Sequence, residues 1–258
     1  MPLIHCYGCG GSYGNVILRA FAQGCGGQSG LKAADMHADA YPKYRGGISV
    51  VWGLERGAPQ IIEQAKAAGE PWIYVDHGYF GRGHPNGYFR VTCNAHQQHW
   101  VTDRPADRWQ ALKIDLKPWH TGRDIVLVPP SPTVRAVFGA YWPPDFKTDR
   151  PIQVSVKDGK PFHEKFKSVH AVLTYHSIAA VEAVVNGIPA FVTGESAALA
   201  STDFSLLETP PFPEREAWAR SLAYGQYTTK EMESGLCWAN LDKSSLAMTA
   251  EKSCHGTS

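Results

Sequence analysis

The sequence lacks a long apolar run and has few cysteines. No stretch of about 18 apolar residues occurs, so we expect no membrane-spanning segment. The first ten residues contain neither the basic stretch nor the apolar core of a secretory signal, which predicts a cytoplasmic protein. Six cysteines in 258 residues are too few for a disulfide scaffold. We expect them to remain thiols in a reducing compartment.

A metal site has little support in the sequence. Cys6 and Cys9 form the one Cys-x-x-Cys pair, and the other four cysteines are isolated. A zinc site would need a second pair of ligands at comparable spacing. The alternative for Cys6 and Cys9 is packing of small residues at a turn. We therefore predict no metal.

Net charge is also small, which at first argues against a polyanionic partner. The chain has 25 Lys plus Arg and 24 Asp plus Glu, a formal charge of +1. Division after Arg123 gives 13 basic and 9 acidic residues in the first part, a net +4, and 12 against 15 in the second, a net −3. Long-range attraction requires a net field. The first part is therefore the more plausible place for an anionic partner.

Short apolar runs alternate with helical patterns along the chain, which indicates an α/β fold with a parallel sheet. In the first half, strands are expected at residues 3–7, 48–52, 72–75 and 88–92, with helices after the first and second of these. In the second half, strands are expected at residues 124–128, 152–156, 169–173 and 190–192, with a helix at 178–186 and a helical pair carrying Trp218, Leu222, Met232 and Trp238.

The sequence thus predicts two Rossmann-like domains. Residues 1–122 form the first, residues 123–240 the second, and residues 241–258 a flexible tail. In such folds ligands bind at the carboxyl ends of the strands. We expect the two sheets to face one cleft that contains the chemistry.

One carboxylate lies in an otherwise apolar helix at 178–185. Ser177 is placed to cap this helix, and Asn186 and Gly187 to end it. Buried Glu182 is costly unless it is hydrogen-bonded, so a structural partner is one explanation. The other is function, because a helix amino end suits a diphosphate and a carboxylate just inside it can accept from ribose hydroxyls.

The segments Thr174-Tyr175-His176-Ser177, Glu182-Ala183 and Gly187-Ile188-Pro189 resemble the donor-binding unit of GT-B glycosyltransferases. The resemblance implies that His176 and Ser177 hold the nucleotide diphosphate and Glu182 the ribose. It also places Ser131 beside the phosphates and Lys157 beside the base. It implies a metal-independent enzyme with a nucleotide-sugar co-substrate and no cofactor. The chain is shorter than the family pattern, so elements that define the acceptor are reduced.

The segment Asp76-His77-Gly78-Tyr79-Phe80-Gly81-Arg82 follows a predicted strand of the first half, where an acceptor would bind. An inverting transferase needs one base for the acceptor hydroxyl. Asp76 is the first candidate and His77 the second. Asp76 as a turn former is the alternative. Tyr79 and Phe80 belong either to the core or to an acceptor platform, and Arg82 is a further candidate for contact with the acceptor or a phosphate.

The glycine-rich loop 8–14 has the spacing G-x-G-x-x-x-G, one residue longer than the dinucleotide fingerprint. Gly10 and Gly11 permit close approach of the backbone to a ligand, and Ser12 and Asn15 can donate to it. A tight turn is the alternative. The loop also suggests an alternative function, that of an NAD(P)-dependent oxidoreductase. Such an enzyme needs an acidic ribose ligand at the end of the second strand, and Glu55 lies somewhat beyond that position.

Residues 82–123 combine seven basic residues with interleaved aromatics, a composition that suits nucleic acid. Solvated charges over an aromatic core are the alternative. The compact layout and the Asp-x-Gly-Tyr-Phe segment resemble phage-borne glycosyltransferases, some of which modify hydroxymethylpyrimidines in DNA. That resemblance implies DNA as acceptor and the host cytoplasm as location.

The predicted function is transfer of a sugar from a nucleotide sugar to a hydroxyl acceptor. The acceptor is either a 5-hydroxymethylpyrimidine in DNA or a glycan. An epimerase-like nucleotide-sugar enzyme of the same architecture is a further alternative. It would consume the donor without an acceptor.

Overall fold

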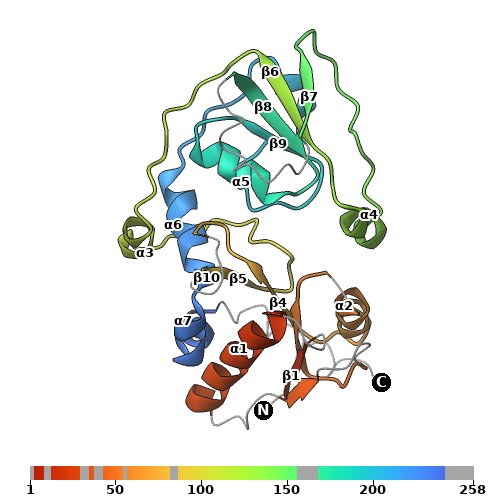
Figure 1. Cartoon of the computed structure of the whole chain (residues 1–258), viewed down its shortest axis with the longest axis vertical. Helices are drawn as coiled ribbons and strands as arrows, with labels where there is room; N and C mark the ends of the chain where they lie inside the picture. The colour runs from red at the N-terminus through yellow and green to blue at the C-terminus, as the bar shows by residue number, and fades with distance from the viewer. Residues whose placement is uncertain are drawn as a thin grey trace, which may run out of the picture. The chain divides into compact units, whose positions relative to one another are not determined.

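The computed structural model describes residues 3–8, 13–29, 35–37, 43–54, 57–81, 87–155 and 168–241. The chain forms two compact units (Figure 1). The first unit joins residues 1–96 to residues 224–258, and the second unit is the continuous segment 97–223. No helix within the described ranges combines the length and the hydropathy of a membrane span.

The first unit is built on a six-stranded sheet with a parallel centre. Its order is β10-β5-β4-β3-β1-β2, in which β4, β3, β1 and β2 run parallel, β5 is antiparallel to β4, and β10 is antiparallel to β5. The strands are β1 (Ile4–Tyr7), β2 (Asp35–His37), β3 (Ile48–Trp52), β4 (Trp72–His77), β5 (Phe89–Cys93) and β10 (Gln226–Tyr227). Helix α1 (Tyr13–Ser29) follows β1, and α2 (Ala58–Ala67) follows β3.

Two cores lie on the two faces of this sheet, because successive side chains of a strand point in opposite directions. On β3, Ile48 and Val50 belong to the core that contains the buried residues of α1, whereas Val51 belongs to the core that contains those of α2. The two helices therefore cover opposite faces (Figure 1). This agrees with the mixed α/β class and parallel sheet expected from the sequence.

The end of the described chain returns to the first unit. Strand β10 pairs with β5, and helices α7 (Thr229–Glu233) and α8 (Leu236–Asn240) pack on α1. The contact with α1 is close at Gly24, where an added Cβ would lie 1.8 Å from the carbonyl oxygen of Met232. Met232 and Trp238 contact the same core as Phe21 of α1. The sequence predicted a helical pair from Trp218 to Trp238. The structure has three helices there, α6 (Glu216–Tyr224) in the second unit and α7 and α8 in the first.

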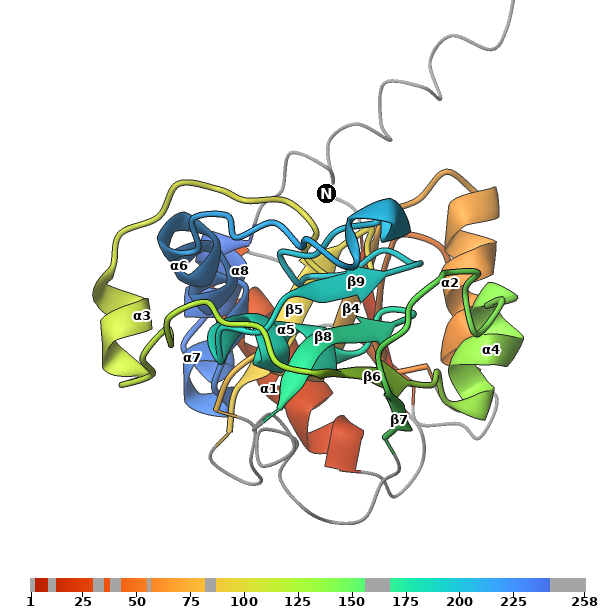
Figure 2. The same cartoon turned by 90° about the horizontal axis from the view of Figure 1, so that it is seen from above.

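The second unit contains a four-stranded, fully parallel sheet of order β7-β6-β8-β9. Its strands are β6 (Asp124–Val128), β7 (Ile152–Val154), β8 (Val169–Thr174) and β9 (Ala190–Val192), and its helices include α3 (Asp107–Ala111), α4 (Pro132–Phe138), α5 (Ile178–Val185) and α6 (Glu216–Tyr224). Helix α5 lies along one face (Figure 2). The other face is covered by Trp142, Phe146 and the short 3-10 helix η2 (Phe204–Leu206).

The unit boundaries differ from the expected ones at residues 123 and 241. Residues 97–122 belong to the second unit, where the indole of Trp119 donates to the carbonyl of Pro213. Residues 224–241 belong to the first unit through β10, α7 and α8. The physical reason is that both segments make their contacts with residues far away in the chain.

Several predicted strand bounds and both ends of helix α5 are confirmed. Strands 48–52, 124–128 and 190–192 have the expected bounds. The Ser177 hydroxyl accepts from the backbone nitrogen of Ala179 as the N-cap of α5, and Gly187 has the left-handed φ of +77°. Strand β2, helices α3 and α4, and strand β10 were not predicted. Helix α3 has five residues and α4 seven, and neither buries a residue, so each is too short for a clear helical pattern in the sequence.

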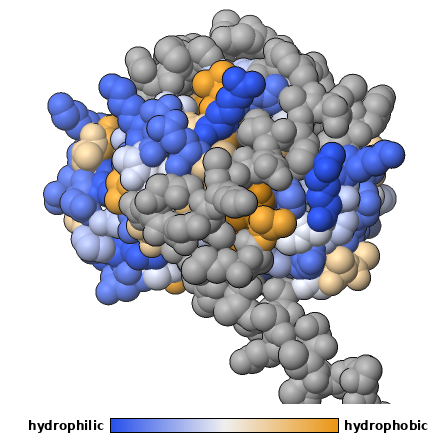
Figure 3. Space-filling model, turned by 90° about the horizontal axis from the view of Figure 1, so that it is seen from below, coloured by the Kyte–Doolittle hydropathy of each residue, from blue (hydrophilic) through white to orange (hydrophobic). Residues whose placement is uncertain are grey.

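The described cysteines Cys6, Cys25, Cys93 and Cys237 are buried thiols, as expected. Burial raises the pKa of Cys6 well above its usual value, with a smaller contribution from the negative charge of Cys25. Cys9 and Cys254 lie outside the described residues. Figure 3 shows a largely hydrophilic surface among the coloured residues, with few hydrophobic side chains. Exposed apolar residues at this frequency are ordinary for a globular protein.

Asp124 begins β6 and is fully buried. Its carboxylate accepts hydrogen bonds from Arg123 Nε at 2.6 Å, Gln153 Nε2 at 2.6 Å and Ser168 Oγ at 3.1 Å. The hydrogen bond from Arg123 is the largest cause of the lowered pKa of Asp124, and burial opposes it. The ionised carboxylate therefore stabilises the second unit at pH values above about 4, the pKa of an aspartate in the unfolded chain.

We expect that contribution to be lost as the pH falls through the lowered folded pKa of Asp124. The Tm of wild type should therefore exceed that of Asp124→Asn at pH 6, and the difference should shrink towards pH 3. Thermal melts of both proteins across this range are the measurement. A difference that does not depend on pH would contradict the assignment.

Candidate functional site

The carboxyl edge of the first sheet has a topological switch point. The connection that leaves β1 leads to β2 on one side of it, and the connection that leaves β3 leads to β4 on the opposite side. The two connections therefore diverge between the neighbouring strands β1 and β3. Ligands in open α/β sheets bind at such points. Tyr13 and Asn15 at the start of α1 and Trp52 at the end of β3 belong to this edge.

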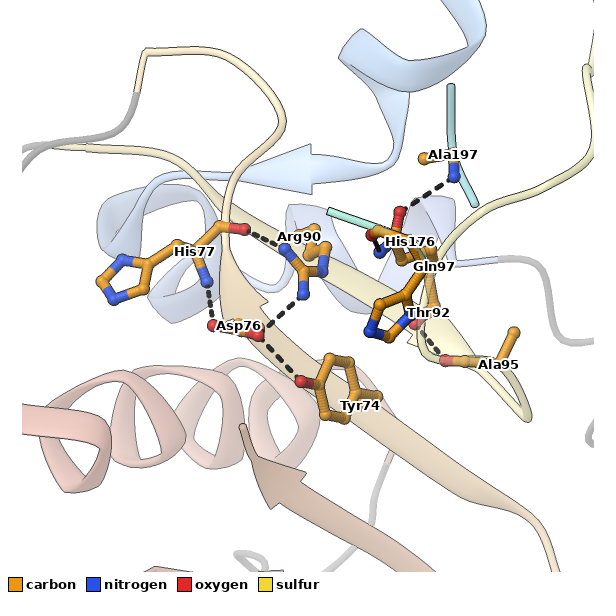
Figure 4. A network of polar contacts seen from close by, with 9 residues as sticks. All are labelled: Tyr74, Asp76, His77, Arg90, Thr92, Ala95, Gln97, His176 and Ala197. Atoms are coloured by element: carbon orange, nitrogen blue, oxygen red, sulfur yellow. Dashed lines mark hydrogen bonds and ion pairs between the residues drawn. The ribbon is translucent and has the colours of Figure 1, made fainter. Parts of the chain in front are cut away.

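Asp76 and His77 end β4 at the same edge (Figure 4). One carboxylate oxygen of Asp76 (Oδ2) accepts from Arg90 Nη2 at 2.7 Å and from the Tyr74 hydroxyl at 2.8 Å. The other (Oδ1) accepts from the backbone nitrogen of His77 at 2.7 Å. Arg90 Nη1 in turn donates to the carbonyl of His77 at 2.8 Å. The Asp76–Arg90 ion pair therefore holds both backbone groups of His77.

This ion pair lies at the boundary of the core. The side chain of Arg90 is 8% exposed and that of Asp76 is 23% exposed. Burial acts to lower the pKa of Arg90, but Asp76, Tyr74 and Tyr79 outweigh it and the pKa is raised. Burial, with the charge of Asp76, raises the pKa of Tyr74 well above its usual range. Arg90 therefore stays charged and Tyr74 stays a hydroxyl donor.

The side chain of His77 is exposed, unlike its neighbours on β4. Its imidazole lies edge-on to the ring of Trp52, with centroids 5.4 Å apart, and 6.4 Å from the ring of Phe89. Trp52 also contacts Tyr13 at 6.0 Å. A histidine with a fixed backbone and an exposed ring, beside the half-buried Trp52 and the buried Phe89, is placed where it can contact a bound molecule and act as a base.

The remaining first-unit candidates have different positions. Asn15 is 9% exposed, and its side-chain oxygen makes no hydrogen bond within the described chain. Tyr79 is 1% exposed and lies 5.9 Å from the guanidinium of Arg90, which agrees with the core alternative. Gly10, Gly11, Ser12 and Arg82 lie outside the described residues. Gly78 has no room for a side chain, because a Cβ would lie 2.6 Å from the carbonyl oxygen of Tyr88.

In the second unit, the turn after β8 is tied to the end of β6. The Thr174 hydroxyl donates to the carbonyl of Val128 at 2.9 Å and accepts from the backbone nitrogen of Ser177 at 3.4 Å. Ser177 then caps α5. The His176 ring packs edge-on against Phe138 of α4, with centroids 5.0 Å apart. The structure therefore brings the loops after β6 and β8 together at one edge of the sheet.

Glu182 is the half-buried carboxylate of α5, whose six buried residues are all Ala or Val. Ser131 caps α4 by accepting from the backbone nitrogen of Val134 at 3.2 Å. Lys157 lies outside the described residues. Thus His176, Ser177, Glu182 and Ser131 lie on the loops and first turns that follow β6 and β8.

Several basic residues of the stretch 82–123 have structural partners. Arg90 pairs with Asp76, Arg108 Nε donates to the carbonyl of Ala223 at 3.0 Å, and Arg123 pairs with Asp124. Lys113 and Lys117 are exposed. Part of the basic excess therefore stabilises the fold.

Within the described ranges, no group of three or more His, Cys, Asp or Glu is arranged to hold a metal ion. Sequence reasoning missed Trp52, Arg90 and Gln97, which contact or position the candidate residues. A lone arginine within a predicted apolar strand was an available signal for Arg90. Gln97 had no comparable signal, since its partners are 79 and 100 residues away.

A scan against models of known protein families and a search of curated proteins each found no match. Among solved structures, the chain is similar to Thermosulfurimonas dismutans KpsC, described as a beta Kdo 2,4 transferase. The two share 14% identity with a TM-score of 0.43, over 84% of this chain and 89% of that one. That likeness alone assigns neither a family nor an activity to this chain.

Proposed function

We propose that the chain is a glycosyltransferase that moves a sugar from a nucleotide-sugar donor to a hydroxyl acceptor. The observation that carries the proposal is the amino end of α5. Ser177 caps this helix at the carboxyl end of a parallel strand, and Glu182 is the single carboxylate on a helix of buried Ala and Val. Free amides with partial positive charge and a nearby carboxylate complement a diphosphate joined to a ribose.

On the donor side, the helix amino end with His176 and Ser177 binds the diphosphate and stabilises the charge that develops as it departs. Glu182 accepts hydrogen bonds from the ribose hydroxyls. Ser131 lies on the neighbouring loop beside the phosphates, and Lys157 is assigned to the base. No metal or cofactor is required for this step.

On the acceptor side, His77 takes the proton of the attacking hydroxyl. The acceptor oxygen bonds to the anomeric carbon, and the bond from that carbon to the diphosphate breaks with its electron pair on the diphosphate. His77 is preferred to Asp76, because both oxygens of Asp76 already accept hydrogen bonds and one pairs with Arg90. In this proposal Asp76 positions His77. Asn15 contributes a polar contact to the acceptor.

Calorimetry with UDP, GDP and CMP sugars tests the donor assignment. We expect one nucleotide class to bind, and Glu182→Gln to weaken its binding by about 1.5–3 kcal/mol, the usual contribution of a hydrogen bond to a charged group. NADPH is the control ligand. Binding of NADPH with none of the sugars would reject the proposal in favour of an oxidoreductase.

For the acceptor, we propose a hydroxymethylpyrimidine in DNA first and a glycan second. Support for DNA is the net charge of +4 over residues 1–123, which include the acceptor candidates of the first unit and the exposed Lys113 and Lys117 of the second unit. Mass spectrometry of nucleosides from hydroxymethylated DNA, after incubation with the bound donor, distinguishes the two. An unshifted nucleoside with an active donor would exclude DNA, and donor consumption without any acceptor would indicate an epimerase-like enzyme.

A further inference from the structure

Gln97 opens the second unit and is 2% exposed. Both halves of its carboxamide are used (Figure 4). Its Nε2 donates to the carbonyl of His176 at 2.5 Å, and its Oε1 accepts from the backbone nitrogen of Ala197 at 2.9 Å. One buried side chain therefore links two segments that follow two different strands.

The first linked segment is the turn that leads into α5. The carbonyl of His176 belongs to the same peptide group as the nitrogen of Ser177, and this nitrogen donates to Thr174 Oγ1. Gln97 and Thr174 thus hold one planar peptide from its two sides. Since Ser177 is the N-cap, the orientation of this peptide sets where the first amides of the helix point.

The second linked segment follows β9, the neighbour of β8 in the sheet. Ala197 is held at its nitrogen by Gln97 and at its carbonyl by the indole of Trp218, at 2.7 Å. The two segments also meet directly, since the nitrogen of Gly194 donates to the carbonyl of Tyr175 at 2.8 Å. A Cβ at Gly194 would lie 2.8 Å from the ring of Tyr175, so the approach is close.

We propose that Gln97 is a positioning residue that fixes the amino end of α5 and couples it to the segment after β9, and thereby sets the affinity for the donor diphosphate. This rests on the proposed function for its ligand. Loss of the carboxamide removes the donor to the His176 carbonyl and the acceptor for the buried Ala197 N–H, and the turn relaxes in response. A buried polar group that fixes a binding loop acts through geometry, without touching the ligand.

The test compares Gln97→Met with Gln98→Met. The neighbour Gln98 is also buried, at 8% exposed, but its amide donates to Ser221 Oγ at 2.7 Å, on α6. Gln98 Nε2 also donates to the carbonyl of Trp100 at 3.3 Å. Both variants therefore lose side-chain hydrogen bonds, and Gln97→Met loses the one to the turn that leads into α5. Hydrogen exchange of the free protein is read at residues 175–180 and 194–198. UDP, GDP and CMP binding is measured by calorimetry.

We expect Gln97→Met to speed exchange in these two segments beyond its effect elsewhere. We also expect it to raise the Kd of the bound nucleotide about tenfold, or about 1.4 kcal/mol, close to the loss of one hydrogen bond to a charged group. Gln98→Met should leave the exchange rates of these two segments and the nucleotide Kd within about twofold of wild type. Gln97→Glu keeps an acceptor for Ala197 but, while ionised, has no donor for the His176 carbonyl, so it should behave like Gln97→Met at pH 8.

Unchanged exchange in a folded Gln97→Met protein would overturn the positioning role. Altered exchange with unchanged nucleotide affinity would overturn its link to the donor. If wild type binds none of the nucleotides, the proposed function fails, whereas the exchange experiment still decides whether Gln97 fixes the turn.

Discussion

Replacing His77 with asparagine is expected to lower kcat for sugar transfer by about 10²–10⁴-fold, the usual contribution of a general base. Asparagine cannot take up the proton of the acceptor hydroxyl. The donor Kd should stay within about twofold, because the donor is assigned to the second unit. The measurement is release of the nucleoside diphosphate under saturating donor, with His120→Asn as an exposed histidine control.

Asp76→Asn separates the two candidate bases. If Asp76 only positions His77, its loss should lower kcat less than the loss of His77, because the His77 ring remains. Arg90 would then lose its charged partner while staying buried, so a lower Tm should accompany the effect. A larger loss of turnover for Asp76→Asn than for His77→Asn would assign the base to Asp76.

Gly24→Ala is expected to destabilise the first unit by about 1–3 kcal/mol or more, as overpacking does in close contacts. The added Cβ would lie 1.8 Å from the carbonyl oxygen of Met232 and 2.9 Å from the nitrogen of Gly235, both backbone atoms. Relief requires α1 to move away from α7 and α8, and this would open the core around Phe21 and Met232.

The sign of the change makes this experiment decisive. Helix propensity alone predicts that Gly→Ala inside a helix stabilises by about 1 kcal/mol. Close packing predicts a fall in Tm of several degrees, about 2–4 °C per kcal/mol for a protein of this size. Thermal unfolding followed by circular dichroism distinguishes the two. A Tm that rises would show that α1 and α7 do not pack as closely as described.

Helix ends and strand bounds that depend on neighbouring residues were predicted from the sequence. The capping of α5 by Ser177 involves atoms two residues apart, and the left-handed Gly187 ends the same helix. The three strands with the expected bounds consist almost entirely of apolar or β-branched residues bounded by polar residues, Gly or Pro. These features depend on neighbouring residues, which a sequence pattern contains.

Contacts between distant residues were not predictable in the same way. Strand β10 is two residues long, and its identity depends on pairing with Arg90 and Phe89 of β5. The partnership of Arg90 with Asp76 depends on the antiparallel register of β4 and β5, which places the two residues opposite each other. Neither the pairing nor the register has a local signature, so the sequence suggested Asp76 as a base or a turn former and did not indicate its partner Arg90.

The return of the chain to the first unit has a consequence for synthesis. Helix α1 precedes the second unit in the chain, but its partners α7 and α8 come about 200 residues later. The second unit is one uninterrupted stretch inserted between the two parts of the first. During translation the second unit can therefore fold while the first still exposes the apolar side of α1. A product that stops early would leave that side open to aggregation.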